Sequence, residues 1–219
     1  MAVPTRPTDD WLLGVLGSAA EAVRGALEAD RATDPGAWRE RGGRPGQYRI
    51  DLVADEAALE VLRAARVGVL SEESGLEDRG NGLIVAVDPV DGSTNASRQL
   101  PWYATSLCAV DDDGPRVALV VNLATGVLYE AVRGGGARRD GRPVRVSGVE
   151  DLSRALVVLN GYPAHHAGWR QYRALGATAL DLCAVADGSA DGTMDCAVAA
   201  LRPWDYLAGA LPVTEAGGV

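Results

Sequence analysis

The chain has 219 residues, of which 47% are hydrophobic and 23% are charged, and its formal net charge at pH 7 is -9. This length and composition are typical of a globular protein with one substantial core or two small ones. The acidic balance disfavours a nucleic-acid backbone or an anionic membrane surface as a partner. A small anionic substrate would therefore have to be attracted locally, by a metal ion or a helix dipole.

Neither membrane insertion nor export is indicated by the sequence. No stretch is long and uncharged enough to span a bilayer, and residues 1–7 lack the apolar core of a signal peptide. The three cysteines, Cys108, Cys183 and Cys196, stand far apart among apolar residues, which favours buried reduced thiols over a disulfide framework. We therefore expect a cytoplasmic protein.

The first two predicted elements are amphipathic helices. Thr8 is expected to cap the first helix, whose apolar residues recur at helical spacing to about Asp30. Residues 33–48 are rich in Gly, Pro and Arg and predict a mobile loop. The second helix is predicted from Leu52 to Arg66, with its apolar residues on one face.

The most informative segment is a buried strand that ends in two carboxylates and a turn of small residues. The apolar run 83–87 predicts the strand, and Pro89 is expected to break its ladder so that the chain leaves the sheet after Asp88. Asp88 and Asp91 can then converge from opposite sides of one tight turn, and Gly92 allows the backbone to approach a ligand. Oxygen ligands beside a phosphate predict Mg²⁺ rather than zinc.

The residues after this turn predict a phosphate cradle. Ser93, Thr94 and Asn95 are the types that cap a helix N-terminus and leave its amides free to bind an anion. Alone, the Asp-x-x-Asp-Gly run is more often an ordinary surface turn. Three further acidic segments with distinctive settings argue against that interpretation. They are Asp51–Asp55 at the start of a helix, Ser71–Gly75 after an apolar run, and Trp204–Asp205 at the start of another helix.

The remaining segments predict two kinds of sheet. An antiparallel meander is expected from strands over residues 105–110, 116–121 and 127–132, with the aspartates 111–113 at a solvated hairpin tip. Strands and helices then alternate over residues 155–160, 178–186, 192–198 and 204–216. We divide the chain into residues 1–150, a helix pair with a largely antiparallel sheet and most metal ligands, and residues 151–219, an α/β part.

Together these motifs resemble the inositol monophosphatase family of Mg²⁺-dependent, Li⁺-sensitive sugar phosphatases, over residues 51–218. The resemblance implies a mixed α/β fold, the layered α-β-α-β-α sandwich of the inositol monophosphatase and fructose-1,6-bisphosphatase type. It also implies Mg²⁺ as cofactor and a homodimer. Because the family continues beyond the position of Gly218 with further strands and a helix, we expect the chain to be truncated at its C-terminal end.

Motif matching to this family implies roles for individual residues. The metal ligands are the side chains of Glu73, Asp88, Asp91 and Asp205 and the backbone carbonyl of Val90. The pair that activates water is Ser93 and Asp55. The substrate contacts are Gly92, Ser93, Thr94, Gly176, Ala177, Thr178, Asp195 and Asp205. Two alternatives stay open, because Asp55 lies nearer to Asp51 than the family pattern requires and could be a helix N-terminal acid, and Asp195 could be a solvated strand-end acid.

The leading hypothesis is a Mg²⁺-dependent phosphomonoesterase acting on inositol monophosphate by metal-activated water. Histidinol phosphate, fructose 1,6-bisphosphate and a phosphoadenosine nucleotide are alternative substrates within the same family. A haloacid-dehalogenase type of phosphatase is disfavoured, since its chemistry uses Asp-x-Asp spacing, whereas two residues separate Asp88 from Asp91. A degenerate, non-catalytic homologue is the third hypothesis, supported by the short Asp51-to-Asp55 segment.

Overall fold

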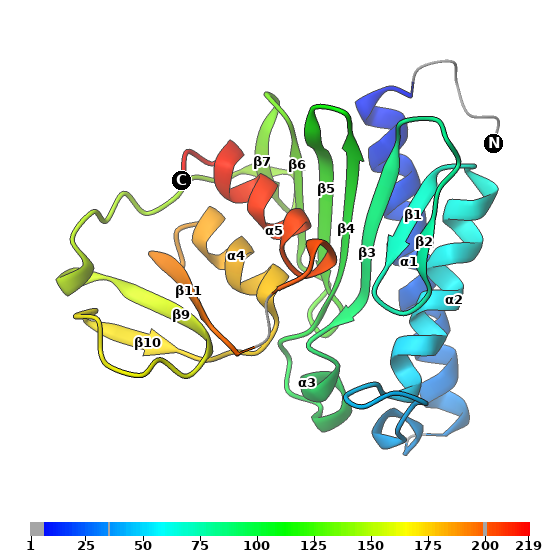
Figure 1. Ribbon diagram of the computed structural model, residues 1–219, viewed down its shortest axis with the longest axis horizontal. Coiled ribbons are helices and arrows are strands. Elements are labelled where there is room, and N and C mark those ends of the chain that lie inside the picture. The colour runs from blue at the N-terminus through cyan, green and yellow to red at the C-terminus, as the bar shows by residue number, and fades with distance from the viewer. Residues whose placement is uncertain (1–6, 35, 199–200) are drawn as a thin grey trace.

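Two long helices, α1 (Asp9–Thr33) and α2 (Arg49–Ala64), pack side by side against one face of a large sheet (Figure 1). The computed structural model describes residues 7–34, 36–198 and 201–219. The Thr8 hydroxyl caps α1 as predicted, accepting a hydrogen bond from the amide of Trp11. Helix α2 begins three residues before its predicted start at Leu52, which places Asp51 inside its first turn.

The large sheet has eight strands in the order β2-β1-β3-β4-β5-β6-β7-β8. Strands β1 and β3 are parallel and all other neighbours are antiparallel. The strands are β1 (Gly68–Ser71), β2 (Gly75–Glu77), β3 (Ile84–Asp91), β4 (Ala104–Asp111), β5 (Gly114–Asn122), β6 (Leu128–Val132), β7 (Gly136–Arg139) and β8 (Arg142–Pro143). Strands β4 to β6 confirm the predicted antiparallel meander.

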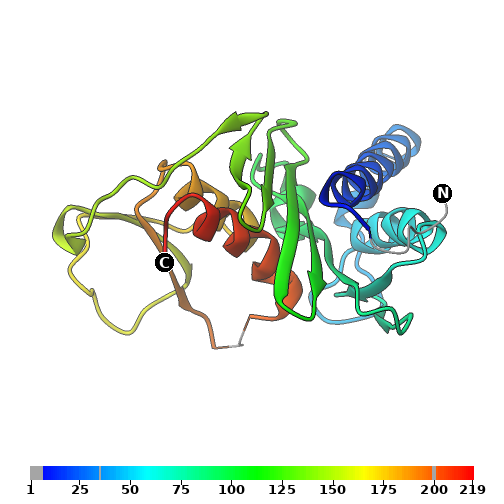
Figure 2. The same cartoon turned by 90° about the horizontal axis from the view of Figure 1, so that it is seen from above.

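The second face of the large sheet is covered by α4 (Thr178–Ala186) and α5 (Pro203–Glu215), which also pack on each other. Beyond them lies a parallel three-stranded sheet in the order β10-β9-β11, formed by β10 (Gln171–Arg173), β9 (Leu156–Gly161) and β11 (Gly192–Cys196). Seen from above, the helix pairs α1/α2 and α4/α5 lie on opposite sides of the large sheet (Figure 2). The layered mixed α/β fold is thus confirmed, whereas the division at residue 150 stays a prediction.

Strand β4 is buried on both faces because each face has its own helical cover. Leu107 and Ala109 pack in the core beneath α1 and α2, while Cys108 between them packs in the core beneath α4 and α5. This alternation explains why the strand is apolar almost throughout, as expected for a strand buried on both sides. Among the helices that the structure describes, none is both long and apolar enough to cross a bilayer.

A β-bulge in β3 sets the direction of two carboxylates. In a regular strand Asp88 and Asp91 would point to opposite faces, because side chains alternate. Asp88 lies opposite Ser106 on β4 and Asp91 lies opposite Ala104, so β3 accommodates one extra residue between them. The bulge therefore brings both carboxylates to one face. The expectation that the chain leaves the sheet at Pro89 is wrong, since a bulge tolerates a residue without an amide proton.

The segment between α1 and α2 differs from the predicted mobile loop. It contains the 3-10 helix η1 (Ala37–Arg39), where Trp38 is buried, and it ends in a bridge between Arg41 and Tyr48. Gln47 is buried as well, since its side chain joins the network described below. Residue 35 of the predicted loop, and residues 1–6 of the segment that lacks signal-peptide character, lie outside the described residues.

Candidate active site

Three carboxylates from separate elements converge at one end of the large sheet. Glu72 follows β1, Asp88 lies in β3 and Asp205 lies in the first turn of α5, and one oxygen of each is within 4.8 Å of the others. The amide of Glu72 donates to the carbonyl of Val87 at 3.1 Å, which fixes the turn after β1 beside β3. The Asp205 carboxylate accepts from the amide of Arg202 at 2.5 Å. We call Glu72, Asp88 and Asp205 the acidic cluster.

Asp91 adjoins the acidic cluster and connects it to α4. Its carboxylate oxygens accept hydrogen bonds from the amides of Thr178 at 3.2 Å and Ala179 at 2.7 Å. These amides belong to the first turn of α4, where no intrahelical acceptor is available. Asp91 therefore positions the start of α4 next to the cluster. Val90 is buried, and the metal-binding role expected of its carbonyl stays a prediction.

The carboxylates of this region are crowded, and Asp88 and Asp91 are buried whereas Glu72 remains exposed to solvent. Burial raises the pKa of Asp88 well above its usual range, and the charges of Asp91, Glu72 and Asp205 raise it further. Burial likewise raises the pKa of Asp91 to about 8 and that of Glu72 to about 7. Such shifts mean that the ionised cluster is unfavourable without a compensating cation.

Asp51 and Ser93 both line a cleft of about 250 Å³. The cleft is lined by Arg44, Pro45, Gly46, Gln47, Asp51, Glu72, Glu73 and Ser93, and we call it the catalytic cleft. One oxygen of Asp51 accepts from the amide of Tyr48 at 2.7 Å, while the other is buried with no partner among the described residues. Burial raises the pKa of Asp51 to about 7, and the nearby Ser93 hydroxyl opposes that rise. An orphaned carboxylate oxygen beside a hydroxyl suits an acid-base pair.

Asp55, which we expected beside Ser93, lies elsewhere. It is one helical turn beyond Asp51, and its carboxylate accepts hydrogen bonds from the hydroxyls of Ser71, at 2.5 Å, and Ser74. These bonds fasten α2 to the β1–β2 turn. The structure therefore places Asp51 rather than Asp55 in the catalytic cleft with Ser93, and a catalytic role of Asp55 stays a prediction.

Glu73, which motif matching predicts to be a metal ligand, also lies apart from its expected partners. It is absent from the acidic cluster, and its carboxylate instead accepts hydrogen bonds from the side chains of Arg44 and Gln47. Its side chain is only 5% exposed, and it faces the segment before α2. The neighbouring Glu72 takes the position expected of Glu73. The two glutamates are consecutive, and only the direction of each side chain distinguishes them.

The two predicted backbone segments of the substrate site lie against each other. Gly92 has φ 83°, and a Cβ there would approach both the Gly176 carbonyl and the Ala177 Cβ to 3.0 Å. Only glycine fits this contact, which joins the end of β3 to the start of α4. Ser93 and Thr94 form the first turn of α3 (Ser93–Arg98), so their amides lack intrahelical acceptors.

Asp195 lies on β11 and does not line the catalytic cleft. Its carboxylate accepts from the Asn160 side-chain amide and the Ala197 amide, both at 3.1 Å. It borders a pocket of about 130 Å³ together with Thr178 and other residues of α4, α5 and β9. The charge of Asp195 raises the pKa of Asp205, after burial, so the two carboxylates are electrostatic neighbours. Its expected contact with substrate stays a prediction.

Residues that our sequence analysis did not select include Glu72 and Asp51. Glu72 carried a signal, because it stands in the same Glu-Glu pair as Glu73. Asp51 also had a signal in the sequence, because an acid at the third position of a helix can accept a hydrogen bond from the backbone amide of the residue before the helix. Arg44 and Gln47 had no signal, since their contacts depend on how the segment before α2 folds.

An acidic cluster beside a serine-carboxylate pair, in a layered mixed α/β fold, suits the hydrolysis of phosphate esters. Comparison with known proteins agrees. The model of the inositol monophosphatase family matches residues 14–219. The chain therefore belongs to the inositol monophosphatase family and is a phosphoric monoester hydrolase, as the sequence resemblance implied. Members of this family act on small phosphate esters.

Relatives and solved structures support the same conclusion. A protein of Archaeoglobus fulgidus named fructose-1,6-bisphosphatase/inositol-1-monophosphatase is 37% identical over 93% of this chain and 80% of its own length. The Nus factor SuhB of Escherichia coli is 30% identical over 82% of this chain and 73% of its own length. The crystal structure of the extragenic suppressor protein suhB from Bartonella henselae has a TM-score of 0.81 at 28% identity, covering 94% of this chain and 85% of that one.

Proposed function

We propose that this enzyme is a Mg²⁺-dependent phosphatase that hydrolyses inositol monophosphate. The convergence of Glu72, Asp88 and Asp205 beside the catalytic cleft is the observation that carries the proposal. Carboxylate oxygens are the donors that Mg²⁺ prefers, and the raised pKa of Asp88 indicates an environment that lacks a compensating charge. These three residues, with Asp91 and the Val90 carbonyl next to them, would bind the ion.

The residues of the cleft have separate tasks in this proposal. When bound, Mg²⁺ supplies positive charge to the transferring phosphoryl group and acidifies water. The orphaned oxygen of Asp51, with the Ser93 hydroxyl, accepts the proton of the attacking water. The free amides of Ser93 and Thr94 donate to phosphate oxygens, and Gly92 lets the backbone approach them. Asp205 and Asp195 bind hydroxyl groups of the leaving alcohol.

Fructose 1,6-bisphosphate is the second substrate that we propose. It is supported by the name of the Archaeoglobus fulgidus relative, which includes both activities. Histidinol phosphate and a phosphoadenosine nucleotide are weaker alternatives, because neither the Archaeoglobus fulgidus nor the Escherichia coli relative carries such a name. Inhibition by Li⁺, a homodimer and a cytoplasmic location are further proposals that rest on the family resemblance.

A non-catalytic role is the alternative that the experiment must exclude. Its support was the short Asp51-to-Asp55 segment, and that support disappears once Asp51 itself lines the catalytic cleft. The relatives named Nus factor SuhB keep the alternative relevant.

Phosphate release from a panel of the four esters, with Mg²⁺ and with excess EDTA, tests the proposal. We expect turnover of inositol 1-phosphate with Mg²⁺, none with EDTA, and none in Asp88→Asn. Turnover that is unaffected by EDTA would contradict the metal mechanism. Absence of turnover in every condition, with intact fold, would favour the non-catalytic alternative.

A further inference from the structure

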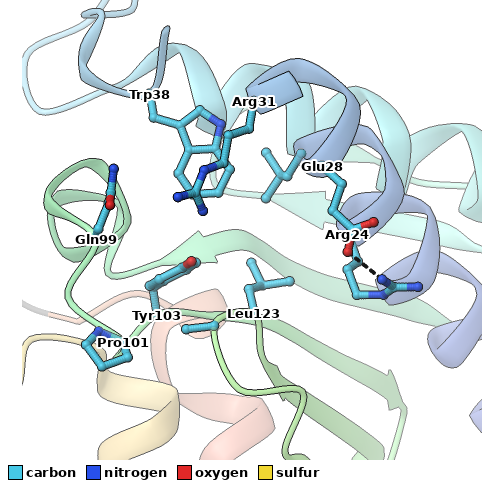
Figure 3. Close-up of a pocket in the computed structure, with 10 residues that line it drawn as sticks. Arg24, Glu28, Arg31, Trp38, Gln99, Pro101, Tyr103 and Leu123 are labelled. Carbon is cyan, nitrogen blue, oxygen red and sulfur yellow. Dashed lines mark hydrogen bonds and ion pairs between the residues drawn. The ribbon is translucent and has the colours of Figure 1, made fainter. Parts of the chain in front are cut away.

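A cavity of about 360 Å³ lies between the C-terminal half of α1, η1 and the loop before β4, and it shares no residue with the catalytic cleft. Figure 3 shows Trp38 and Arg31 above the cavity and Tyr103, Pro101 and Leu123 below it. We call this the Trp38 cavity. Its volume is within the usual range of about 300 to 1,000 Å³ for sites that bind small molecules.

Two aromatic side chains give the Trp38 cavity a fixed shape. The rings of Trp38 and Tyr103 meet edge to face, with centroids 6.2 Å apart and an interplanar angle of 88°. Both side chains are buried in the core beneath α1 and α2, so they are not free to turn away. Leu123 and Pro101 add apolar surface opposite Trp38 (Figure 3). This part of the wall favours a ligand with a planar apolar ring, whereas several other lining side chains are polar or charged.

One arginine that lines the cavity, Arg31, has no ion-pair partner among the described residues. The Arg24 guanidinium is neutralised by Glu21 and by Glu28, the latter at 2.5 Å, as the dashed line in Figure 3 indicates. Arg31, in contrast, lies over the Trp38 ring, with its guanidinium carbon 5.4 Å from the ring centroid. Within the described ranges, no carboxylate forms an ion pair with Arg31. A cation that packs on an aromatic face keeps its capacity to bind an anion.

A second donor near Arg31 is unsatisfied. The indole N–H of Trp38 is buried and has no acceptor within the part of the chain that the structure describes. In Figure 3 the indole nitrogen lies beside the Arg31 side chain. Buried donors without a partner are uncommon in folded proteins, and each requires an explanation. A ligand that paired with Arg31 and moved it away from the Trp38 ring would bring an acceptor to the indole N–H, and would thus explain why this donor has no partner in the protein.

We propose that the Trp38 cavity binds a planar aromatic monoanion, specifically an aryl carboxylate. The ring packs against Tyr103 and Leu123, and the carboxylate pairs with Arg31. A doubly charged ligand is disfavoured, because Arg24 is already neutralised and Glu28 adds a negative charge to the same cavity. The proposal concerns a site apart from the acidic cluster, and it does not depend on the proposed phosphatase activity.

Calorimetric titration of the metal-free protein with 2-naphthoate tests this proposal. Prior removal of metal by dialysis against EDTA excludes coordination of the carboxylate by a bound cation. We expect saturable binding with one ligand per chain. We also expect affinity about two- to fivefold higher than for the neutral 2-naphthol, since one charge pair is lost. Cyclohexanecarboxylate, which has the charge without the aromatic ring, should bind more weakly than 2-naphthoate.

Two variants that each remove one positive charge test whether 2-naphthoate binds in the Trp38 cavity. Arg31→Gln should reduce the affinity for 2-naphthoate to that of 2-naphthol. Arg138→Gln, which removes an exposed arginine on β7, should leave the affinity unchanged. Leu123→Phe should reduce binding by filling the cavity, and its thermal unfolding midpoint shows whether the fold is preserved.

Three results would overturn the proposal. The first is the absence of saturable binding by 2-naphthoate. The second is an equal loss of affinity in Arg31→Gln and Arg138→Gln, which would indicate a general effect of charge. The third is affinity that falls as protein concentration rises, because a second copy of the chain would then cover the cavity.

Discussion

Glu72 and Glu73 are adjacent in the chain, but their carboxylates belong to different networks. An oxygen of Glu72 lies within 4.8 Å of oxygens of Asp88 and Asp205. Glu73 instead accepts hydrogen bonds from Arg44 and Gln47, at the segment before α2. Glu72 thus belongs to the acidic cluster, whereas Glu73 holds the segment before α2 in place beside the catalytic cleft.

This difference predicts unequal effects of the same substitution. Glu72→Gln should lower Mg²⁺-dependent kcat/KM on the order of 100-fold, about 3 kcal/mol of transition-state stabilisation, because it removes a charged ligand of the cluster. Glu73→Gln should change it by about fivefold at most, since the amide oxygen still accepts a hydrogen bond from Arg44 or Gln47. Phosphate-release kinetics measure kcat/KM for both variants. A larger loss in Glu73→Gln would reverse the assignment.

Asp51 and Asp55 offer a second matched pair. Asp51→Asn should reduce kcat by about 10² to 10⁴, the usual contribution of a general base, while folding is preserved. Asp55→Asn should retain kcat but lower the free energy of unfolding by about 1 to 3 kcal/mol, because its carboxylate accepts from two serine hydroxyls. Urea unfolding and kcat are measured on the same preparations. If Asp55→Asn loses kcat without loss of stability, the original expectation for Asp55 was correct.

Both differences between the predicted and the observed positions of these acidic residues have a physical cause. Asp51 and Asp55 are four residues apart and share one face of a helix, so choosing between them requires the helix start. The prediction began α2 at Leu52 and thus left Asp51 outside the helix, whereas the structure begins it at Arg49. For Glu72 and Glu73, the register at the end of β1 decides which carboxylate faces the cluster. The sequence pattern does not specify that register.

The parts of the fold that were predictable are those with strong local patterns. The apolar periodicity of α1, the meander of β4 to β6 and the extent of α4 agree with expectation. The bulge between Asp88 and Asp91 was not foreseen, because Pro89 also suits the end of a strand. Contacts between distant segments, such as Gly92 with Ala177, arise only when the layers assemble.

Asp91 positions the start of α4 and is also proposed to bind the metal, and Asp91→Asn separates these two roles. The asparagine oxygen can still accept from the amide of Thr178 or Ala179, so the start of α4 should remain in place. The charge next to the cluster is lost, and Mg²⁺-dependent turnover should therefore be nearly abolished. Circular dichroism and kcat are the measurements. A variant that keeps more than about a tenth of the activity, a change of only 1.4 kcal/mol, would argue against a metal-binding role.

The buried carboxylates also predict how stability depends on pH. In the metal-free folded chain, burial raises the pKa of Asp91 to about 8, whereas in the unfolded chain this group ionises near pH 4. Between these values the folded state binds more protons than the unfolded state, so the free energy of unfolding falls as pH rises from about 4 to about 8. Saturating Mg²⁺ should offset this loss.

Urea unfolding in EDTA at pH 5 and pH 8 measures that effect. The fall in stability should be smaller in Asp91→Asn, which lacks one of the titrating groups, and it should be smaller again when Mg²⁺ replaces EDTA. An identical pH dependence in the parent chain and in Asp91→Asn would be inconsistent with the raised pKa of Asp91.

Titration with Mn²⁺, followed by its electron paramagnetic resonance signal, tests most directly whether Glu72, Asp88 and Asp205 form a cation site. We predict saturable binding that Mg²⁺ displaces, that Asp88→Asn abolishes and that Glu73→Gln preserves. Mn²⁺ binding of unchanged affinity in Asp88→Asn would contradict the central claim that this cluster binds the catalytic metal.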